Sequence, residues 1–451
     1  MEYLLSFLLL GLNLFDYEYN INQLLFFVVG TVLIIALFAV CYKKTKDVLC
    51  SCVMLMCHTW QISWINIFGD PTEKLQLPWF YIIGAVVLFF AIVKIPTLKD
   101  RPVNALVLGI FVTLCVVSVY PLLISPSLME GLKEFIMIIF FVILAFIAFL
   151  CHGSMSKEQR EHVIKAYICA VVLSSLFIVV QYVSYSLFNR ILFKFSLGNY
   201  NGIPMTSANL LMEDTSCSTI MLGTGVFYML ERINEKKHVF VNVLFILLTV
   251  MSLGLTSRRT SIISLVICFV FYVPLRYKGI MKKLTMMTLL FGAAVLMILY
   301  LIVARPVEDY GQYLDSNGRF ENYLLSIGLF LEHPLGIGYD NVELVNQLNS
   351  FEPHNTVLRW LNMAGIVFTL LMLTVLAYIL YAAFKKKLTA ELWALVYVLI
   401  AMNFIPDILN ARFFVIICMM VLLSVPHKKS ELSSRDSVIL KNIRKNKVYK
   451  N

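Results

Sequence analysis

The chain of 451 residues is 60% hydrophobic and only 14% charged, with a mean hydropathy of +0.83. Soluble domains carry charge on about a quarter of their residues, so this composition excludes a soluble globule and indicates an integral membrane protein. The net charge of +10 does not indicate a nucleic-acid partner, because the basic residues are distributed as membrane topology requires.

Apolar stretches of about 20 residues, enough to cross a bilayer as a helix, recur along the whole chain. The first has no basic flank, which is not typical of a cleaved signal peptide. The predicted fold class is therefore all-α, a polytopic bundle of transmembrane helices. The predicted spans number fourteen, the first of which is short and could instead lie at the membrane interface: 3–15, 22–42, 48–68, 78–96, 103–123, 133–151, 163–187, 212–230, 239–256, 260–276, 284–304, 357–383, 389–405 and 411–426.

Lysine-rich clusters fall in every second loop, so the positive-inside rule predicts that both termini face the cytoplasm. The opposite, outer side carries mainly arginine, whose planar guanidinium binds phosphate through two hydrogen bonds where lysine acts as a point charge. This side is thus predicted to hold a phosphorylated or otherwise anionic ligand. For Arg359 or Arg412 taken alone, the alternative is a helix-end side chain that extends into water, which explains the whole set less well. The outer arginines are Arg190, Arg258, Arg259, Arg305, Arg319, Arg359 and Arg412.

Two of these arginines, Arg258 and Arg259, stand between two predicted spans with almost no loop. The alternative is a polar turn with no further role. A ligand site is favoured because two adjacent cations on the outer side oppose the usual orientation preference, and intramembrane cations are commonly functional. Hydroxyl groups that could assist in binding an anion follow and precede the pair, at Thr256, Ser257 and Thr260.

The segment 305–356 is a polar loop longer than ordinary connections, which indicates a functional role. Apolar residues at positions 320, 323, 324, 327 and 331 predict a helix that lies on the membrane or docks across the bundle. A cap at 315–317 would place Arg319 and Glu321 in its first turn, where a helix N-terminus favours anions. Pro334 then ends the helix, Gly336 and Gly338 permit a tight turn, and Asp340 caps a short helix to residue 348.

The pair His354-Asn355 opens the twelfth predicted span. One interpretation is structural, with Asn355 as a helix cap and an unremarkable surface histidine. The other is catalytic, because a histidine titrates near neutral pH and can take a proton from a hydroxyl nucleophile. The residues alone leave both open.

The sequence contains neither a Walker loop nor a dinucleotide glycine pattern, and its loop carboxylates are scattered. We therefore expect no metal and no nucleotide cofactor. The basic tail is expected to lie disordered against the anionic cytoplasmic leaflet. The predicted organisation is N-terminal spans in 1–211, central spans in 212–304, the large loop in 305–356, C-terminal spans in 357–426 and the tail in 427–451.

Three stretches together resemble the bacterial O-antigen ligase and polymerase superfamily: the Ser-Arg-Arg turn, the loop motifs G-R-F-E-N and E-H-P-L-G-I-G-Y, and H-N-T-V-L-R-W-L-N-M-A-G-I-V. The likeness covers about a quarter of the chain, Leu253 to Leu371. It implies a glycosyltransferase of GT-C-like architecture in the bacterial inner membrane. This enzyme would act at the periplasmic face on undecaprenyl-diphosphate-linked oligosaccharide, among membrane lipids and with no cofactor.

Carried over by position, the resemblance assigns the diphosphate to Arg258 or Arg259 together with Arg319, and Arg190 is a further candidate among the outer arginines. His354, or less favourably Glu321, would act as the base, with Asn355 and Gly338 in support. Extra N-terminal spans favour a polymerase, which could have a chain-length regulator as partner, over a ligase that transfers glycan to lipid A core. A glycolipid transporter is a third alternative, but it predicts charged residues within the spans, and these are few.

Overall fold

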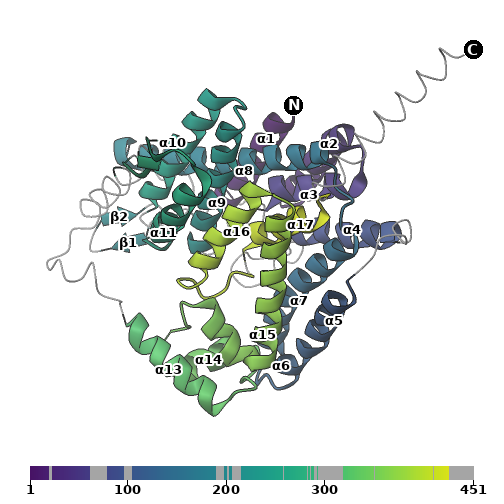
Figure 1. Cartoon of the computed structure of the whole chain (residues 1–451), viewed down its shortest axis with the longest axis vertical. Coiled ribbons are helices and arrows are strands. Elements are labelled where there is room, and N and C mark those ends of the chain that lie inside the picture. Colours follow the sequence, from purple (N-terminus) through teal and green to yellow (C-terminus); the bar gives the residue numbers. More distant parts are fainter. Residues whose placement is uncertain are drawn as a thin grey trace, which may run out of the picture.

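The structure is a computed structural model, and it describes residues 1–19, 23–60, 79–95, 104–188, 198–200, 203–205, 215–256, 259–281, 283–284, 286–288, 292, 318–349, 351–409 and 411–425. These residues form helices and one short antiparallel hairpin (Figure 1). The elements are α1 (Glu2–Tyr19), α2 (Gln23–Thr45), α3 (Val48–Thr59), α4 (Trp79–Lys94), α5 (Ala105–Val117), α6 (Val119–Leu123), α7 (Leu128–Leu150), α8 (Lys157–Phe188), β1 (Gly198–Tyr200), β2 (Ile203–Met205), α9 (Thr215–Asn234), α10 (Val239–Leu255), α11 (Arg259–Arg276), α13 (Arg319–Glu332), α14 (Asn341–Leu348), α15 (Thr356–Lys385), α16 (Thr389–Ala401) and α17 (Arg412–Leu423).

The predicted all-α polytopic membrane fold is confirmed. Within the described residues, six helical segments are long and apolar enough to cross a membrane. The predicted span 284–304 lies almost entirely outside the described residues, and the count of fourteen stays a prediction. The six segments are Phe27–Thr45, Ala105–Leu123, Leu128–Leu150, Lys157–Tyr185, Arg259–Arg276 and Thr356–Lys385.

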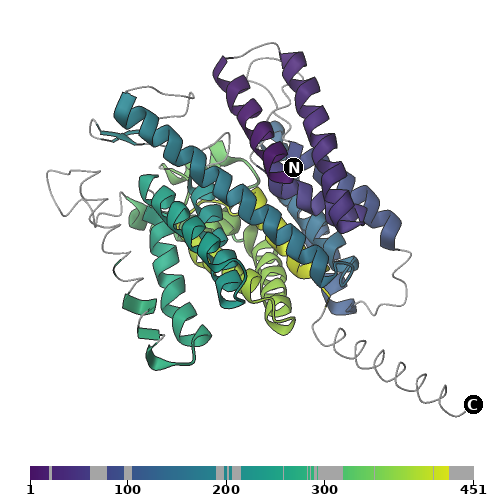
Figure 2. The ribbon, with the colours of Figure 1, turned by 90° about the horizontal axis from the view of Figure 1, so that it is seen from above.

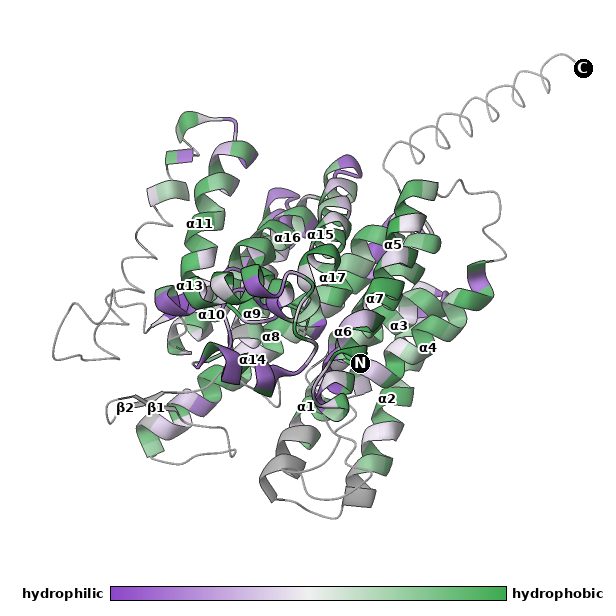
Figure 3. Ribbon diagram, turned by 90° about the horizontal axis from the view of Figure 1, so that it is seen from below, coloured by the Kyte–Doolittle hydropathy of each residue, from purple (hydrophilic) through white to green (hydrophobic). Residues whose placement is uncertain are grey.

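Two short helices form the centre of the bundle. Every residue of α17 is buried, and so are all residues of α3 from Leu49 onward. Each has 12 residues, so each is about 18 Å long at 1.5 Å per residue and is surrounded by other helices instead of lipid. α17 packs against α3, α7, α15 and α16. Large apolar side chains are exposed on outer helices such as α2, α5 and α10, as expected where hydrocarbon covers them (Figure 3).

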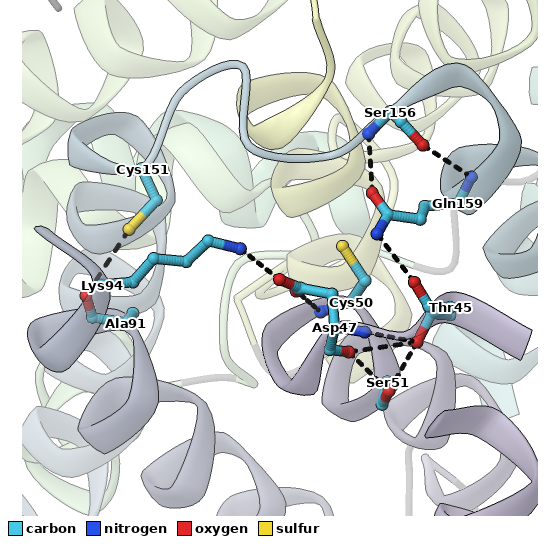
Figure 4. Close-up of polar contacts among 9 residues, drawn as sticks. All are labelled: Thr45, Asp47, Cys50, Ser51, Ala91, Lys94, Cys151, Ser156 and Gln159. Carbon is cyan, nitrogen blue, oxygen red and sulfur yellow. Dashed lines mark hydrogen bonds and ion pairs between the residues drawn. The ribbon is translucent and has the colours of Figure 1, made fainter. Parts of the chain in front are cut away.

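The longest helix, α8, joins the two halves of the bundle. It passes between the N-terminal helices α1 to α3 and the central helices α9 and α10 (Figure 2). At its first turn, Gln159 donates to the backbone oxygen of Thr45 at 2.8 Å, while Asp47 caps α3 and pairs with Lys94 of α4 at 2.5 Å (Figure 4). These contacts hold the lysine-bearing ends of α2, α4 and α8 together.

Helices α13 and α14 lie at one end of the molecule (Figure 1), where α13 packs on α15. The predicted helix from Arg319 and its end before Pro334 are confirmed, as is the cap at Asp340, which accepts from Val342 and Glu343 N–H at 3.0 and 3.1 Å. The predicted cap at 315–317 is wrong, because the N-cap is Gly318 at φ +76°.

The apolar stripe of α13 faces outward. Phe320, Leu324, Ile327 and Leu331 are exposed, while Asn322, Ser326 and Leu329 face the protein. The docking across the bundle is confirmed by the packing of α13 on α15, while a position of its exposed apolar side in the membrane interface stays a prediction.

Candidate functional site

The turn that follows α13 inserts into a break in α15. At Gly365 the backbone leaves the helical conformation (φ +80°, ψ 177°), so nearby backbone groups lack their helical partners. The turn supplies hydrogen-bond partners for these backbone groups. Ile337 N–H donates to Asn362 O at 2.9 Å, and Gly338 N–H donates to Met363 O at 3.0 Å. In the opposite direction, Ile366 N–H donates to Pro334 O at 2.9 Å. The turn and the kinked helix therefore complete each other's hydrogen bonding.

Gly338 is required by this close packing. Its φ is +102°, and a Cβ there would lie 2.7 Å from Cα of Ser125, in the segment between α6 and α7. The next residue, Tyr339, donates its N–H to the Ser125 hydroxyl at 2.8 Å. The structure thus places Gly338 as a scaffold residue that binds the loop to the N-terminal half.

Replacing Gly365 with alanine is expected to lower the apparent melting temperature of the purified protein. The new Cβ would lie 2.4 Å from the carbonyl carbon of Leu335, and the backbone conformation costs about 1–3 kcal/mol for a residue other than glycine. Thermal unfolding in detergent would measure the effect. Gly328→Ala on α13 is the matched control, since nothing lies within 4 Å of its Cβ position. Equal melting temperatures in the two variants would contradict the docking described above.

The sequence left open whether the His354-Asn355 pair forms a helix cap or supplies a base, and the structure gives the cap to Asn355. Asn355 is the cap of α15, and its side chain accepts from Val357 and Leu358 N–H at 3.0 and 3.1 Å. Nδ1 of the half-buried His354 ring lies 3.1 Å from the backbone oxygen of Glu352. A carbonyl can only accept, so in the neutral ring Nδ1 carries the proton and Nε2 keeps a lone pair. Among the described residues, Nε2 has no hydrogen-bond partner, so it is available to take a proton.

Helix α13 fixes the segment that carries His354. The hydroxyl of Tyr323 lies 2.8 Å from the backbone oxygen of His354 and 3.1 Å from that of Asn403, just after α16. The amide of Asn322 donates to Phe351 O at 2.6 Å, and the Phe351 ring stands perpendicular to the imidazole at 5.4 Å. The histidine is thereby held between α13, α15 and α16.

Arg319 lies one helical turn before Tyr323, as the first residue of α13. Burial raises the pKa of the Tyr323 hydroxyl, and the positive charge of Arg319 partly opposes this rise. The guanidinium is therefore electrostatically close to the tyrosine that contacts the His354 segment. Glu321 is exposed on the same helix. Its proposed role as an alternative base gains no support from this position.

The sequence interpretation of Arg359 as a helix-end arginine in water is wrong. Its side chain is only 3% exposed and pairs with Asp407 at 2.8 Å, Glu134 at 3.0 Å and Glu352 at 3.3 Å. Burial, only partly opposed by Arg359, raises the pKa of the Asp407 carboxyl to about 6. We call these four residues the Arg359 cluster.

The Arg359 cluster continues to His354. Glu352 pairs with Arg359 through its carboxylate, and its backbone oxygen holds Nδ1 of the imidazole. Sequence reasoning missed these carboxylates because α7, the segment between α14 and α15, and the loop after α16 supply one each. One sequence signal could have indicated the cluster: Asp407 is an acidic residue directly between two apolar spans.

Arg412 is also buried instead of extended into water. Its side-chain N–H donates to the Trp60 backbone oxygen at 2.9 Å, and its guanidinium lies 5.7 Å from the centre of the Tyr81 ring. Arg412 therefore joins α17 to α3 and α4 within the bundle.

Arg259 is the half-buried first residue of α11, and several contacts place this helix end near the histidine end of α16. Ser261 hydrogen bonds to Thr219 of α9, and the hydroxyl of Tyr397 on α16 donates to Ser261 O at 3.2 Å. Cys217 of α9 in turn contacts the backbone oxygen of Asp407. The start of α11 therefore lies at the same end of the bundle as the Arg359 cluster. Arg258 and Arg190 lie outside the described residues.

This end of the bundle carries His354, Arg319 and Arg259, the residue types that general base catalysis and the stabilisation of an anionic leaving group require. Within the described ranges, no three His, Cys, Asp or Glu side chains are arranged to hold a metal ion. Metal independence stays a prediction.

Comparison with protein families matches residues 244–373 to the family described as O-antigen ligase. The matched range begins within α10 and ends within α15. It contains the Arg258-Arg259 turn, the α13–α14 segment, His354 and the Gly365 kink. Comparison with curated proteins gave no match.

Proposed function

We propose that the chain is a polymerase of a bacterial surface polysaccharide, and the match of residues 244–373 to the family described as O-antigen ligase supports this. The same match supports the coarser activity, glycosyl transfer of polymerase or ligase type. The proposed donor is an undecaprenyl-diphosphate-linked oligosaccharide at the periplasmic face of the inner membrane. A chain-length regulator is a proposed partner only because the chain is proposed to be a polymerase.

The observation that carries this proposal is the state of His354. Its Nδ1 is occupied by Glu352 O, and its Nε2 is open, at the end of the bundle that also bears Arg319 and Arg259. In the proposed step, an acceptor hydroxyl attacks the anomeric carbon and its proton passes to Nε2. The bond from that carbon to the diphosphate oxygen breaks, and the electron pair leaves with the diphosphate.

The proposed role of the arginines is to stabilise this leaving group. Negative charge grows on the diphosphate as the bond breaks, and preorganised guanidinium groups in a place with little water lower the barrier. Arg319 and one of Arg258 and Arg259 are the proposed ligands, and Arg190 is a further candidate. With this charge stabilised by arginine, the proposed reaction needs no metal.

Deletion of the gene in its host is expected to leave lipid A core that carries a single repeat unit, as seen on a lipopolysaccharide gel. A ligase would instead leave bare core and lipid-linked polymer, and that outcome would replace the polymerase assignment.

Complementing the deletion strain with the Arg319→Ala variant should not restore the ladder of chain lengths. Lys133→Ala is the control, because Lys133 is an exposed cation near the start of α7, at the same end of the bundle. A normal ladder with Arg319→Ala would remove Arg319 from the site.

A further inference from the structure

A groove between α8 and α10 has the shape and polarity of a lipid site. Its volume is about 470 Å³, within the range of about 300–1,000 Å³ that is typical of ligand sites. The lining comes mainly from these two helices, with one residue each from α1 and α9: Tyr3, Lys165, Ile168, Cys169, Val172, Leu173, Arg232, His238, Val241, Asn242 and Phe245.

The polar residues gather at one end of the groove. On α8, Lys165 is followed three to eight residues later by Ile168, Val172 and Leu173, which lie on the same helix face. On α10, His238 at the N-cap is followed by apolar positions such as Phe245. Both helices therefore pass from a polar beginning to an apolar continuation, like the head group and acyl chain of a phospholipid.

The polar end has a surplus of positive charge. The carboxylate of Glu161 is shared among Arg232, Lys237 at 3.2 Å and Lys165 at 4.0 Å. The only second acid in this set is Glu235, which pairs with Lys237 at 2.7 Å. The N-cap His238 makes no side-chain cap bond, so the partial positive charge of the α10 N-terminus adds to the surplus.

The groove lies at the end of the bundle away from His354, beside exposed apolar side chains. Phe240 and Leu244 of α10 are exposed next to the groove. Arg232 also lines a basic cavity with Lys386, directly after α15, whereas His354 directly precedes the cap of α15. The part of α15 that follows the break, from Ile366 to Lys385, alone has 20 residues and is about 30 Å long, so an occupant of the groove is distinct from the proposed donor at His354.

We propose that this groove binds an anionic glycerophospholipid from the leaflet at the lysine-rich end, with its phosphate near Lys165 and one acyl chain along α8 and α10. Basic pockets between transmembrane helices on the cytoplasmic side are known to bind anionic lipid head groups. The proposal does not depend on the enzymatic activity.

The test is native mass spectrometry of the purified full-length protein, mixed with phosphatidylglycerol or phosphatidylcholine of the same acyl chains. Wild type should retain phosphatidylglycerol preferentially. Lys165→Met, which keeps the apolar stem, should retain about fivefold less of it, the equivalent of about 1 kcal/mol for one cation at a membrane surface. Retention of phosphatidylcholine should not change.

Two further variants separate head group from chain. Lys43→Met removes an exposed lysine of α2 at the same end but outside the groove, and it should behave as wild type. Val172→Trp fills the apolar part and should reduce retention of both lipids. The proposal would be overturned if wild type retained the two lipids equally, or if the two lysine variants lost equal amounts of phosphatidylglycerol. Full retention of both lipids by Val172→Trp would also overturn it.

Discussion

Replacing Arg359 with methionine is expected to destabilise the protein by about 3–5 kcal/mol, the cost of removing one partner from a buried ion pair. The guanidinium is 3% exposed and holds Glu134, Glu352 and Asp407 around itself. Without it, three carboxylates share a site with little water and no cation. The measurements are the yield of folded protein and the apparent melting temperature in detergent.

Two additional variants show that charge is the cause. Adding Asp407→Asn to Arg359→Met should recover part of the lost stability, because one of the repelling carboxylates is gone. Lys385→Met, at the exposed opposite end of α15, should have little effect. If Arg359→Met melts at the wild-type temperature, the Arg359 cluster does not hold the structure together.

The loss of stability caused by Arg359→Met should also depend on pH. The folded-state pKa of Asp407, about 6, is above its ordinary value of 3.8. The stability that the protonated Asp407 carboxyl contributes to the folded state is therefore fully present below pH 3.8, and it is lost as the pH rises through 6. Removing Arg359 withdraws the one cation that lowers this pKa, so Arg359→Met should be less harmful at pH 5 than at pH 8.

Local features of the loop were predictable from the sequence. The end of α13 before Pro334 and the Asp340 cap each depend on a few adjacent residues with strong conformational preferences, whereas the cap of α13 at Gly318 was predicted one to three residues too early. The apolar period of α13 was also correctly read, but hydropathy could not show which side faces the protein. In a membrane protein, an apolar face can meet lipid, and α13 docks through Asn322 and Ser326 instead.

The tertiary parts of the site could not be predicted in the same way. The segment 357–383 was predicted as one continuous span, and nothing local marks Gly365 as a break, since glycine is common inside transmembrane helices. The break exists because the turn at Gly338 supplies the missing hydrogen-bond partners. Likewise, Arg359 looked like a helix-end residue because Glu134 and Asp407, on other elements, reach it only in the folded bundle.

Replacing His354 with alanine is expected to reduce glycan transfer by about 10²–10⁴-fold, the usual contribution of general acid–base catalysis. The apparent melting temperature should change little, because the half-buried ring makes one side-chain hydrogen bond, to Glu352 O. The assay is elongation of a lipid-linked glycan by the purified protein in vesicles.

The decisive comparison is with His354→Asn. An asparagine amide can place an N–H near the position of Nδ1 and keep the bond to Glu352 O, but it has no basic nitrogen in place of Nε2. If His354 is the base, His354→Asn should be as inactive as His354→Ala. If the ring only orders the segment between α13 and α15, asparagine should restore most of the activity, and the proposed proton transfer would have to be assigned to another group. Because Tyr323 contacts the backbone oxygen of residue 354 and not its side chain, and because both variants lose the ring contact with Phe351, a difference between them reports on the hydrogen bond to Glu352 O.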